Sequence, residues 1–404
     1  MAMPRGLMMK AVVLAAGEGN RLRPFTVSRP KVMIPIGNRP ILEYVVRALA
    51  SNGITDIILV VGYMKERIMS FFGNGARFGV QISYAIQEKQ LGTAHAALAV
   101  RDQVQEEFIM VAGDNIIDAQ AIADLLGHGD GMAMLVTESE MPSKYGVVHI
   151  EGGRVVDIIE KPDKKVGNII NTGIYRLPPS IFDHLEKGVM AGRSGITHVL
   201  HGCLPKIKME AVRSTGRWMD AVYPWDLVRL NEYAFSMAGQ ETSGTIEAGV
   251  TMRGPVRVGA GSRIRAGCYI EGPVSIGEGC EIGPYVTIFP TSSIGNGVNI
   301  APFTTIDSSI IMNNVSIGSH SHISRAVIDD GCRIMTGLSA PSGLAQVKVE
   351  DDFFKVERAG SMVGEFTQIG PRVVLSAGAI VGANCRVGDG AKVSGTLEDR
   401  SIVV

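Results

Sequence analysis

The 404-residue chain lacks a charge excess of either sign, because 39 Lys and Arg residues balance 40 Asp and Glu residues and the formal net charge is -1. Proteins that bind nucleic acid or an anionic membrane surface usually carry a basic excess. The sequence also lacks an apolar run of the roughly 18 residues that a membrane-spanning helix needs. We therefore expect neither a nucleic-acid partner nor a membrane partner.

Cysteine is scarce, and its spacing follows no recognisable pairing pattern. The five cysteines show no C-x-x-C spacing and no accompanying histidines: Cys203, Cys268, Cys280, Cys332 and Cys385. This spacing argues against a zinc site and against a disulfide framework. A reduced compartment, the cytoplasm, is the expected location.

The chain is long enough for two or three domains. Its two halves differ in the periodicity of their apolar residues. From residue 9 to about 236, short apolar runs such as Ile57–Val61 alternate with amphipathic stretches such as Ile41–Asn52. Continuous apolar strands separated by helices predict an α/β fold with a mainly parallel sheet that is covered on both faces. Ligands bind such sheets beyond the carboxyl ends of the strands, so we expect the site in the loops that follow these runs.

A six-residue repeat begins after a predicted linker at 239–244. Aliphatic residues recur every six positions from Val258 to Ile306 and again from Ile369 to Val393, with shorter in-phase stretches between. This is the hexapeptide signature of a parallel β-helix. Four of the cysteines lie four residues after a repeat position, where we expect small inward-facing side chains to pack. The break from Met335 to Met362 predicts a loop that projects from the β-helix.

A glycine-rich loop follows the first apolar run of the chain. Residues 14–31 read LAAGEGNRLRPFTVSRPK. A strand that ends in a glycine turn presents backbone N–H groups to an anion, and Arg21 and Lys31 add positive charge where a triphosphate would lie. The spacing G-x-G-x-R-L-x-P-x-T-x-x-x-P-K is too particular for an ordinary tight turn. The loop therefore predicts a triphosphate site.

Two acidic residues lie in segments where an apolar strand would not require a polar side chain. Asp114 follows the apolar run Phe108–Val111, and Asp220 lies beside the aromatic Trp218. Each aspartate alone could be a helix cap or a turn residue. Two carboxylates brought to one point, however, form a hard-oxygen site for Mg²⁺, whose other ligands are commonly phosphate oxygens. Together with the anion loop, the pair predicts a magnesium site.

The segment QEKQLGTA ends another predicted strand and suits a nucleobase. The carboxamides of Gln87 and Gln90 can donate and accept hydrogen bonds at once, as the edge of a pyrimidine requires. Gly92 would let the backbone approach the ring closely. Three later residues suit sugar hydroxyls or a phosphate: Glu160, Asn171 and Lys161.

Taken in order, these segments resemble the motifs of the sugar-1-phosphate nucleotidylyltransferases: GEGNRLRPFTVSRPK, QEKQLGTA, AGDN, YGVV, EKP, NTGIY and RWMD. The resemblance covers essentially the whole chain, because in many members of the family a hexapeptide β-helix follows the nucleotidyltransferase domain. The chain most resembles the archaeal and bacterial members that are bifunctional, with both nucleotidyltransferase and acetyltransferase activity. It implies a Rossmann-like nucleotidyltransferase domain at 8–238, followed by a left-handed parallel β-helix, acyltransferase-like, at 246–404.

The resemblance also implies roles for individual residues. Asp114 and Asp220 would hold Mg²⁺, and Arg21 and Lys31 would be the catalytic residues on the triphosphate. The implied nucleotide-binding positions are Leu14, Ala16, Gly17, Gly19, Gln87, Gln90, Gly92 and Thr93. The implied sugar-phosphate-binding positions are Gly146, Glu160, Lys161 and Asn171. The Q-x-x-Q-L-G-T form favours UTP or dTTP, with a hexose 1-phosphate such as glucose 1-phosphate or N-acetylglucosamine 1-phosphate as second substrate.

Two interpretations remain for the β-helix. In bifunctional members it acetylates glucosamine 1-phosphate with acetyl-CoA, and a histidine acts as general base. Here the repeat register puts Ser319 at that position, with His320 one place later and His322 at the position of a tyrosine. Either histidine could serve as the acetyl-transfer base. Alternatively, the β-helix serves only assembly or allosteric binding, and we expect a homotrimer or a dimer of trimers through it.

A third hypothesis treats the whole chain as a non-catalytic regulatory subunit, because similar domain pairs occur in such proteins. The presence of Arg21, Lys31, Asp114 and Asp220 argues against it.

Overall fold

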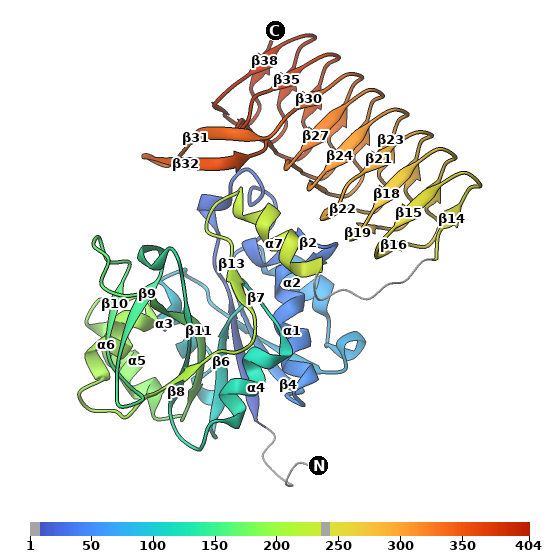
Figure 1. Cartoon of the computed structure of the whole chain (residues 1–404). Coiled ribbons are helices and arrows are strands. Elements are labelled where there is room, and N and C mark those ends of the chain that lie inside the picture. Colours follow the sequence, from blue (N-terminus) through green and yellow to red (C-terminus); the bar gives the residue numbers. More distant parts are fainter. Residues whose placement is uncertain (1–8, 236–242) are drawn as a thin grey trace. The chain divides into compact units, whose positions relative to one another are not determined.

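The computed structural model describes residues 9–235 and 243–404, and it divides into two units (Figure 1). The first unit contains the described residues up to Glu18, then Arg29–Met33 and Ile41–Asp220; the second contains Gly19–Ser28, Ile34–Pro40 and Ala221–Val404. The linker predicted at 239–244 lies mostly outside the described residues. The predicted domain boundaries, 8–238 and 246–404, stay a prediction.

A nine-stranded sheet of order β5-β4-β1-β6-β11-β8-β12-β10-β9 forms the centre of the first unit. Its strands are β1 (Lys10–Ala15), β4 (Asp56–Val61), β5 (Gln81–Ile86), β6 (Phe108–Ala112), β8 (Ala133–Glu138), β9 (Gly146–Glu151), β10 (Arg154–Glu160), β11 (Ile169–Leu177) and β12 (Glu210–Arg213). Only β10 and β11 run against the direction of the other seven described strands. The predicted mainly parallel sheet is confirmed.

Helices cover both faces of this sheet. They are α1 (Ile41–Ser51), α2 (Lys65–Phe72), α3 (Thr93–Leu98), α4 (Ala119–Gly127), α5 (Ile181–Met190) and α6 (Ile196–Cys203). Successive side chains of a strand point to opposite faces, so Val13 of β1 packs in one hydrophobic core with α1, while Val12 packs in the other with α5. These strands are apolar along their whole length because both of their faces are buried.

The second unit contains a parallel β-helix, built from three sheets whose strands are two or three residues long. Thr245 of β14 (Thr245–Ile246) pairs with Arg263 of β17 (Arg263–Ile264), so one coil takes eighteen residues, or three hexapeptides. Some coils take seventeen, as where Ile294 pairs with Ile311. This explains the one-residue shifts between the in-phase stretches of the sequence.

The inward-facing repeat residues and four cysteines form one hydrophobic core along the β-helix. Each of these thiols donates a hydrogen bond to a backbone carbonyl at 2.9–3.1 Å: Cys268 to Gly283, Cys280 to Gly295, Cys332 to Gly364 and Cys385 to Glu398. The predicted packing role of these cysteines is confirmed. None of the five cysteines, all of them described, forms a disulfide.

The break predicted at Met335–Met362 contains an antiparallel hairpin of β31 (Gly343–Val349) and β32 (Asp352–Ala359), which projects from the stack of coils (Figure 1).

In the same unit, α7 (Asp226–Phe235) lies on the β-helix, where Asn231 Nδ2 donates to Thr291 O at 2.7 Å. Among the described helices, none is both long and apolar enough to span a membrane.

Candidate active site

Two short strands bring the predicted metal-binding aspartates together. Asp114 directly precedes β7 (Asn115–Ile117), and Asp220 is the last residue of β13 (Trp218–Asp220). The two strands pair antiparallel, with Asp220 opposite Asn115. Because cross-strand neighbours lie close together, this pairing places Asp220 beside the residue that follows Asp114.

Lys31 lies between the two carboxylates. It begins the 3₁₀ turn η2 (Lys31–Met33), and its Nζ is 2.6 Å from Asp114 Oδ2 and 2.7 Å from Asp220 Oδ1. The Lys31 side chain is 13% exposed, and those of Asp114 and Asp220 are 38% and 15% exposed. Burial lowers the pKa of Lys31, but the two carboxylates outweigh it, so the pKa is raised overall. Lys31 is therefore a fixed positive charge at this edge of the sheet.

The pair of carboxylates fits a divalent cation whose other ligands come from outside the protein. Both carboxylates reach one Nζ atom, so their oxygens lie within range of a single small ion. Within the described ranges, no group of three or more His, Cys, Asp or Glu side chains could enclose a metal. Mg²⁺ is commonly bound in this way, by one or two carboxylates with water and substrate phosphates.

The loop predicted to bind the triphosphate is divided between the two units. In the first unit, Leu14 ends β1 with Ala15, and the carbonyl of Ala16 accepts a hydrogen bond from Tyr63 N at 3.2 Å. A Cβ on Gly17 would meet no other atom within 4 Å, so its backbone faces open space.

Gly19 and Arg21 belong to the second unit. Gly19 has a φ of 80°, and Arg21 lies in the 3₁₀ turn η1 (Asn20–Leu22) that follows it. The guanidinium Nε of Arg21 is 3.8 Å from Glu350 Oε2, which lies between the two strands of the hairpin. Both side chains are partly exposed, so this ion pair is a weak one.

The predicted base-recognition segment follows β5. Gln87 is buried, and its Nε2 donates to Gly92 O at 3.0 Å and lies 3.1 Å from His95 Nδ1. Gln90, Gly92 and Thr93 are exposed. Gln87 therefore holds the loop in place from within, while Gln90 is an exposed residue of the same loop.

Gly92 is required by its backbone and its neighbour. Its φ of 96° and ψ of 175° lie in a region that only glycine readily adopts. A Cβ there would lie 2.4 Å from Ser194 O. Thr93 begins α3, and its Oγ1 accepts from Ile196 N at 3.0 Å.

The predicted sugar-phosphate residues lie on adjacent strands. Gly146 is paired with Glu160, and Lys161 N donates to Tyr145 O at 3.0 Å. A Cβ on Gly146 would come within 3.0 Å of Glu160 Oε2, so glycine leaves room beside that carboxylate. Lys161 Nζ lies 3.9 Å from Glu160 Oε1.

Asn171 is buried on β11 and engaged at both ends of its amide. Its Nδ2 donates to Tyr175 OH at 2.5 Å, and its Oδ1 accepts from Gly173 N at 2.9 Å. Burial raises the pKa of Tyr175, so its phenol stays protonated.

Sequence reasoning gave no role to Thr172, which links the sugar side to the metal side. The carbonyl of Thr172 accepts from Asn115 Nδ2 and from Trp218 Nε1, each at 2.9 Å. Trp218 also lies edge-on to Tyr145, with ring centroids 5.3 Å apart. These residues all stand inside the recognised motifs, but only their contacts reveal that they join β7, β11 and β13.

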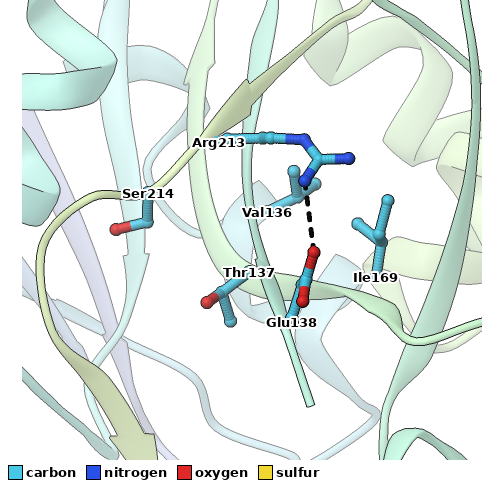
Figure 2. Close-up of a pocket in the computed structure, with 6 residues that line it drawn as sticks. All are labelled: Val136, Thr137, Glu138, Ile169, Arg213 and Ser214. Carbon is cyan, nitrogen blue, oxygen red and sulfur yellow. Dashed lines mark hydrogen bonds and ion pairs between the residues drawn. The ribbon is translucent and has the colours of Figure 1, made fainter.

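A separate pocket of about 220 Å³ opens at the ends of β8 and β12. Figure 2 shows its lining: Val136, Thr137, Glu138, Ile169, Arg213 and Ser214. Arg213 Nη1 and Glu138 Oε1 form an ion pair across it at 3.2 Å. None of the residues predicted for the site lines this pocket.

The two candidate acetyl-transfer bases lie on the β-helix. His320 has a φ of 56° at a turn between strands, and its ring stacks on Phe303 with centroids 5.1 Å apart. Phe303 stacks in turn on Tyr285, and all three side chains are exposed. His322 begins β27 (His322–Ser324) and is exposed as well.

Comparison with known families matches both halves of the chain. The model of the nucleotidyl transferase family matches residues 10–233. The model described as GMPPB C-terminal domain matches residues 270–354, and that of the bacterial transferase hexapeptide (six repeats) matches residues 360–395.

Individual relatives extend this likeness. The bifunctional protein GlmU of Methanococcus maripaludis (strain C7) is 38% identical over 98% of this chain and 97% of that protein. A glucose-1-phosphate thymidylyltransferase of Streptomyces antibioticus is 32% identical over 63% of this chain and 74% of that protein. The crystal structure of a protein from Bacillus anthracis, titled as a glucose-1-phosphate thymidylyltransferase in complex with a sucrose, has a TM-score of 0.52 and 29% identity, covering 56% of this chain and 95% of that one.

Proposed function

The chain belongs to the nucleotidyl transferase family, and we propose that it joins UTP or dTTP to a hexose 1-phosphate to give a nucleotide sugar and pyrophosphate. The observation that carries this proposal is the cluster of Lys31 with Asp114 and Asp220 at the edge of the sheet. A site with one buried ammonium and two convergent carboxylates suits a reaction that moves a nucleotidyl group between phosphates.

The reaction needs no covalent intermediate with the protein. A phosphate oxygen of the sugar 1-phosphate attacks the α-phosphorus of the nucleotide, the new P–O bond forms, and the bond to the β-phosphate oxygen breaks as pyrophosphate leaves. The protein contributes positioning and charge. Asp114 and Asp220 would hold Mg²⁺, which when bound neutralises phosphate charge.

The remaining residues would bind the two substrates. Lys31 and Arg21 would neutralise phosphate oxygens, and the backbone N–H groups of the glycine loop would donate to them. The predicted nucleotide-binding and sugar-phosphate-binding positions keep these roles in the proposal. The geometry refines one of them, because Gln87 supports the loop from within and the exposed Gln90 is the better candidate for contact with the base.

A screen for pyrophosphate release tests this proposal. Purified protein with Mg²⁺ would be assayed against ATP, CTP, GTP, UTP and dTTP, each with glucose 1-phosphate and with N-acetylglucosamine 1-phosphate. We expect turnover with UTP or dTTP. The absence of turnover with every pair would overturn the proposal in favour of a regulatory subunit.

Acetyl transfer in the β-helix is the second candidate function. The full-length similarity to a relative named as bifunctional supports it, because that similarity includes the hexapeptide repeats. Coenzyme A release from acetyl-CoA with glucosamine 1-phosphate would be measured for wild type, His320→Ala and His322→Ala. Activity that is lost in one variant would assign the base, and no activity in a protein that releases pyrophosphate would favour the scaffold role.

The hexapeptide repeats also support a homotrimer or a dimer of trimers, which light scattering with size-exclusion chromatography would measure. The five free thiols are consistent with a reducing compartment such as the cytoplasm.

A further inference from the structure

The loop that leads into β13 is tied to helix α4 by one carboxylate. Asp124 Oδ2 accepts hydrogen bonds from Thr215 N at 2.5 Å and from Gly216 N at 3.1 Å. The hydroxyl of Thr215 donates to the same carboxylate, 2.9 Å from Oδ1. The Asp124 carboxylate thus accepts hydrogen bonds from two consecutive backbone N–H groups, which belong to residues 91 and 92 positions later in the chain.

The loop also lies unusually close to the first turn of α4. A Cβ on Gly216 would lie 2.2 Å from Ala121 N and 2.5 Å from Asp118 Oδ1, so only glycine fits. Asp118 caps α4 by accepting from Ala121 N, and its own N–H donates to Arg217 O at 3.3 Å. The contacts therefore fix the loop along its length from Thr215 to Arg217.

This loop leads directly into β13, whose last residue is Asp220. Only Trp218 and Met219 separate Arg217 from Asp220, and β13 pairs with β7 over just three residues. So short a ladder gives little resistance to a shift in register. An anchor immediately before it limits the positions that the Asp220 carboxylate can reach.

We propose that Asp124 is a positioning residue for Asp220, holding the loop before β13 so that the Asp220 carboxylate stays beside Asp114 and Lys31. This inference rests on the proposed function, in which Asp220 holds Mg²⁺. Asp124 itself does not contact Lys31 or Asp114, and it acts through the backbone of Thr215 and Gly216. Groups that hydrogen-bond directly to metal ligands typically change metal affinity by roughly 10–100-fold when replaced, and we expect this more distant anchor to act at the lower end of that range.

Two readouts test the proposal with Asp124→Ala and Asp124→Asn in the full-length protein. The first is hydrogen exchange of the amides in 214–220, without nucleotide or metal. The second is the Mg²⁺ concentration that gives half-maximal pyrophosphate release at saturating substrates. We expect faster exchange across 218–220 and a half-saturating Mg²⁺ concentration raised about tenfold, with most of kcat recovered at high Mg²⁺.

Two variants on the same helix serve as controls. Gln120→Ala removes a partner of Asp124 at 2.7 Å but leaves the loop contacts intact. Ile122→Val trims a fully buried side chain of α4 and so reproduces a mild loss of stability. Both should keep the wild-type exchange and Mg²⁺ dependence.

The outcomes separate this inference from the proposed function. Unchanged exchange, or an unchanged Mg²⁺ dependence in folded Asp124 variants, would overturn the positioning role. A wild-type protein without Mg²⁺-dependent turnover would overturn the proposed function. Faster exchange in the variants of such a protein would leave Asp124 as a structural anchor only.

Discussion

The ammonium of Lys31 lies 2.7 Å from Oδ1 of Asp220, a residue 189 positions later in the chain. The same atom lies 2.6 Å from Oδ2 of Asp114, so one cation is shared by a carboxylate of β13 and a carboxylate in the turn between β6 and β7. The ammonium of Lys31 thus forms an ion pair with each of the two carboxylates. In the proposed function, these two carboxylates would also be the protein ligands of Mg²⁺.

Asp114→Asn tests the metal assignment. The amide keeps the size of the side chain but loses the charge that a divalent cation needs, so we expect turnover to fall at least ~100-fold while the fold is retained. Pyrophosphate release and circular dichroism would measure both effects. Asp102→Asn, at an exposed carboxylate in the 3₁₀ turn η4 (Arg101–Gln103), is the control and should keep full activity. Near-normal turnover of Asp114→Asn would refute the assignment.

Lys31→Gln should make stability depend on Mg²⁺. Removal of the ammonium takes away the positive charge that both carboxylates share, which we expect to cost ~1–3 kcal/mol of unfolding free energy. Mg²⁺ can replace part of the lost charge, so it should raise the melting temperature of the variant more than that of wild type. Thermal melts with EDTA and with Mg²⁺ measure this difference. Equal Mg²⁺ responses in the two proteins would contradict the shared-charge arrangement.

Gly92→Ala should weaken nucleotide binding. The backbone of Gly92 lies in a glycine-only region, and the added Cβ would collide with Ser194 O. We expect a strain of ~1–3 kcal/mol, relieved by movement of the loop that carries Gln90, and hence a higher KM for the nucleotide. Gly53→Ala is matched to it, because Gly53 also has a positive φ but open space around its Cβ. If both variants raise the KM equally, the close packing on Ser194 is irrelevant to binding.

The β-helix thiols should resist alkylation. Burial raises the pKa of Cys268, Cys280, Cys332 and Cys385, and the thiolate is the reactive form. A rise in pH to about 9, which ionises many exposed thiols, should therefore leave these four unmodified by iodoacetamide in the native protein. Mass spectrometry before and after unfolding in guanidinium provides the comparison. Rapid native modification of any of the four would contradict the burial of that position.

The contribution of Asp124 to stability should depend on pH. Burial raises the pKa of Asp124, but hydrogen bonds from Gln120, Thr215 and Gly216 outweigh it and lower the pKa below its ordinary value of 3.8. A folded-state pKa below the unfolded value gives stability that is present above pH 3.8 and is lost as the pH falls through the folded-state pKa. The difference in unfolding free energy between wild type and Asp124→Asn should therefore be constant near neutral pH and shrink in acid. Denaturant melts from pH 7 to pH 3 would show this, and a difference that grows in acid would contradict it.

Much of the fold could be predicted because the relevant patterns are local. A strand of the first unit is apolar throughout because both faces are buried, and an inward-facing residue recurs every six positions in the β-helix. Such periodicities depend only on which face each residue presents. The cysteines could be placed for the same reason.

Contacts between distant segments could not be predicted in this way. The sequence shows Lys31, Asp114 and Asp220 as separate motifs, and no local pattern says that one ammonium bridges both acids. Gln87 looks like a free carboxamide in sequence, but its neighbours Gly92 and His95 occupy it. The break in the repeat predicts a projecting loop, and the projecting segment is formed by the paired strands β31 and β32.

The sequence by itself determined the two architectures, the motifs of the family and the residue types at the site, because these depend on periodicity and on chemistry that each side chain carries alone. Only the tertiary structure decided which groups share a charge, which amides are already engaged and which carboxylate accepts hydrogen bonds from the loop before β13. Those properties depend on distances of a few ångströms between residues far apart in the chain, and the packing of strands and helices sets such distances.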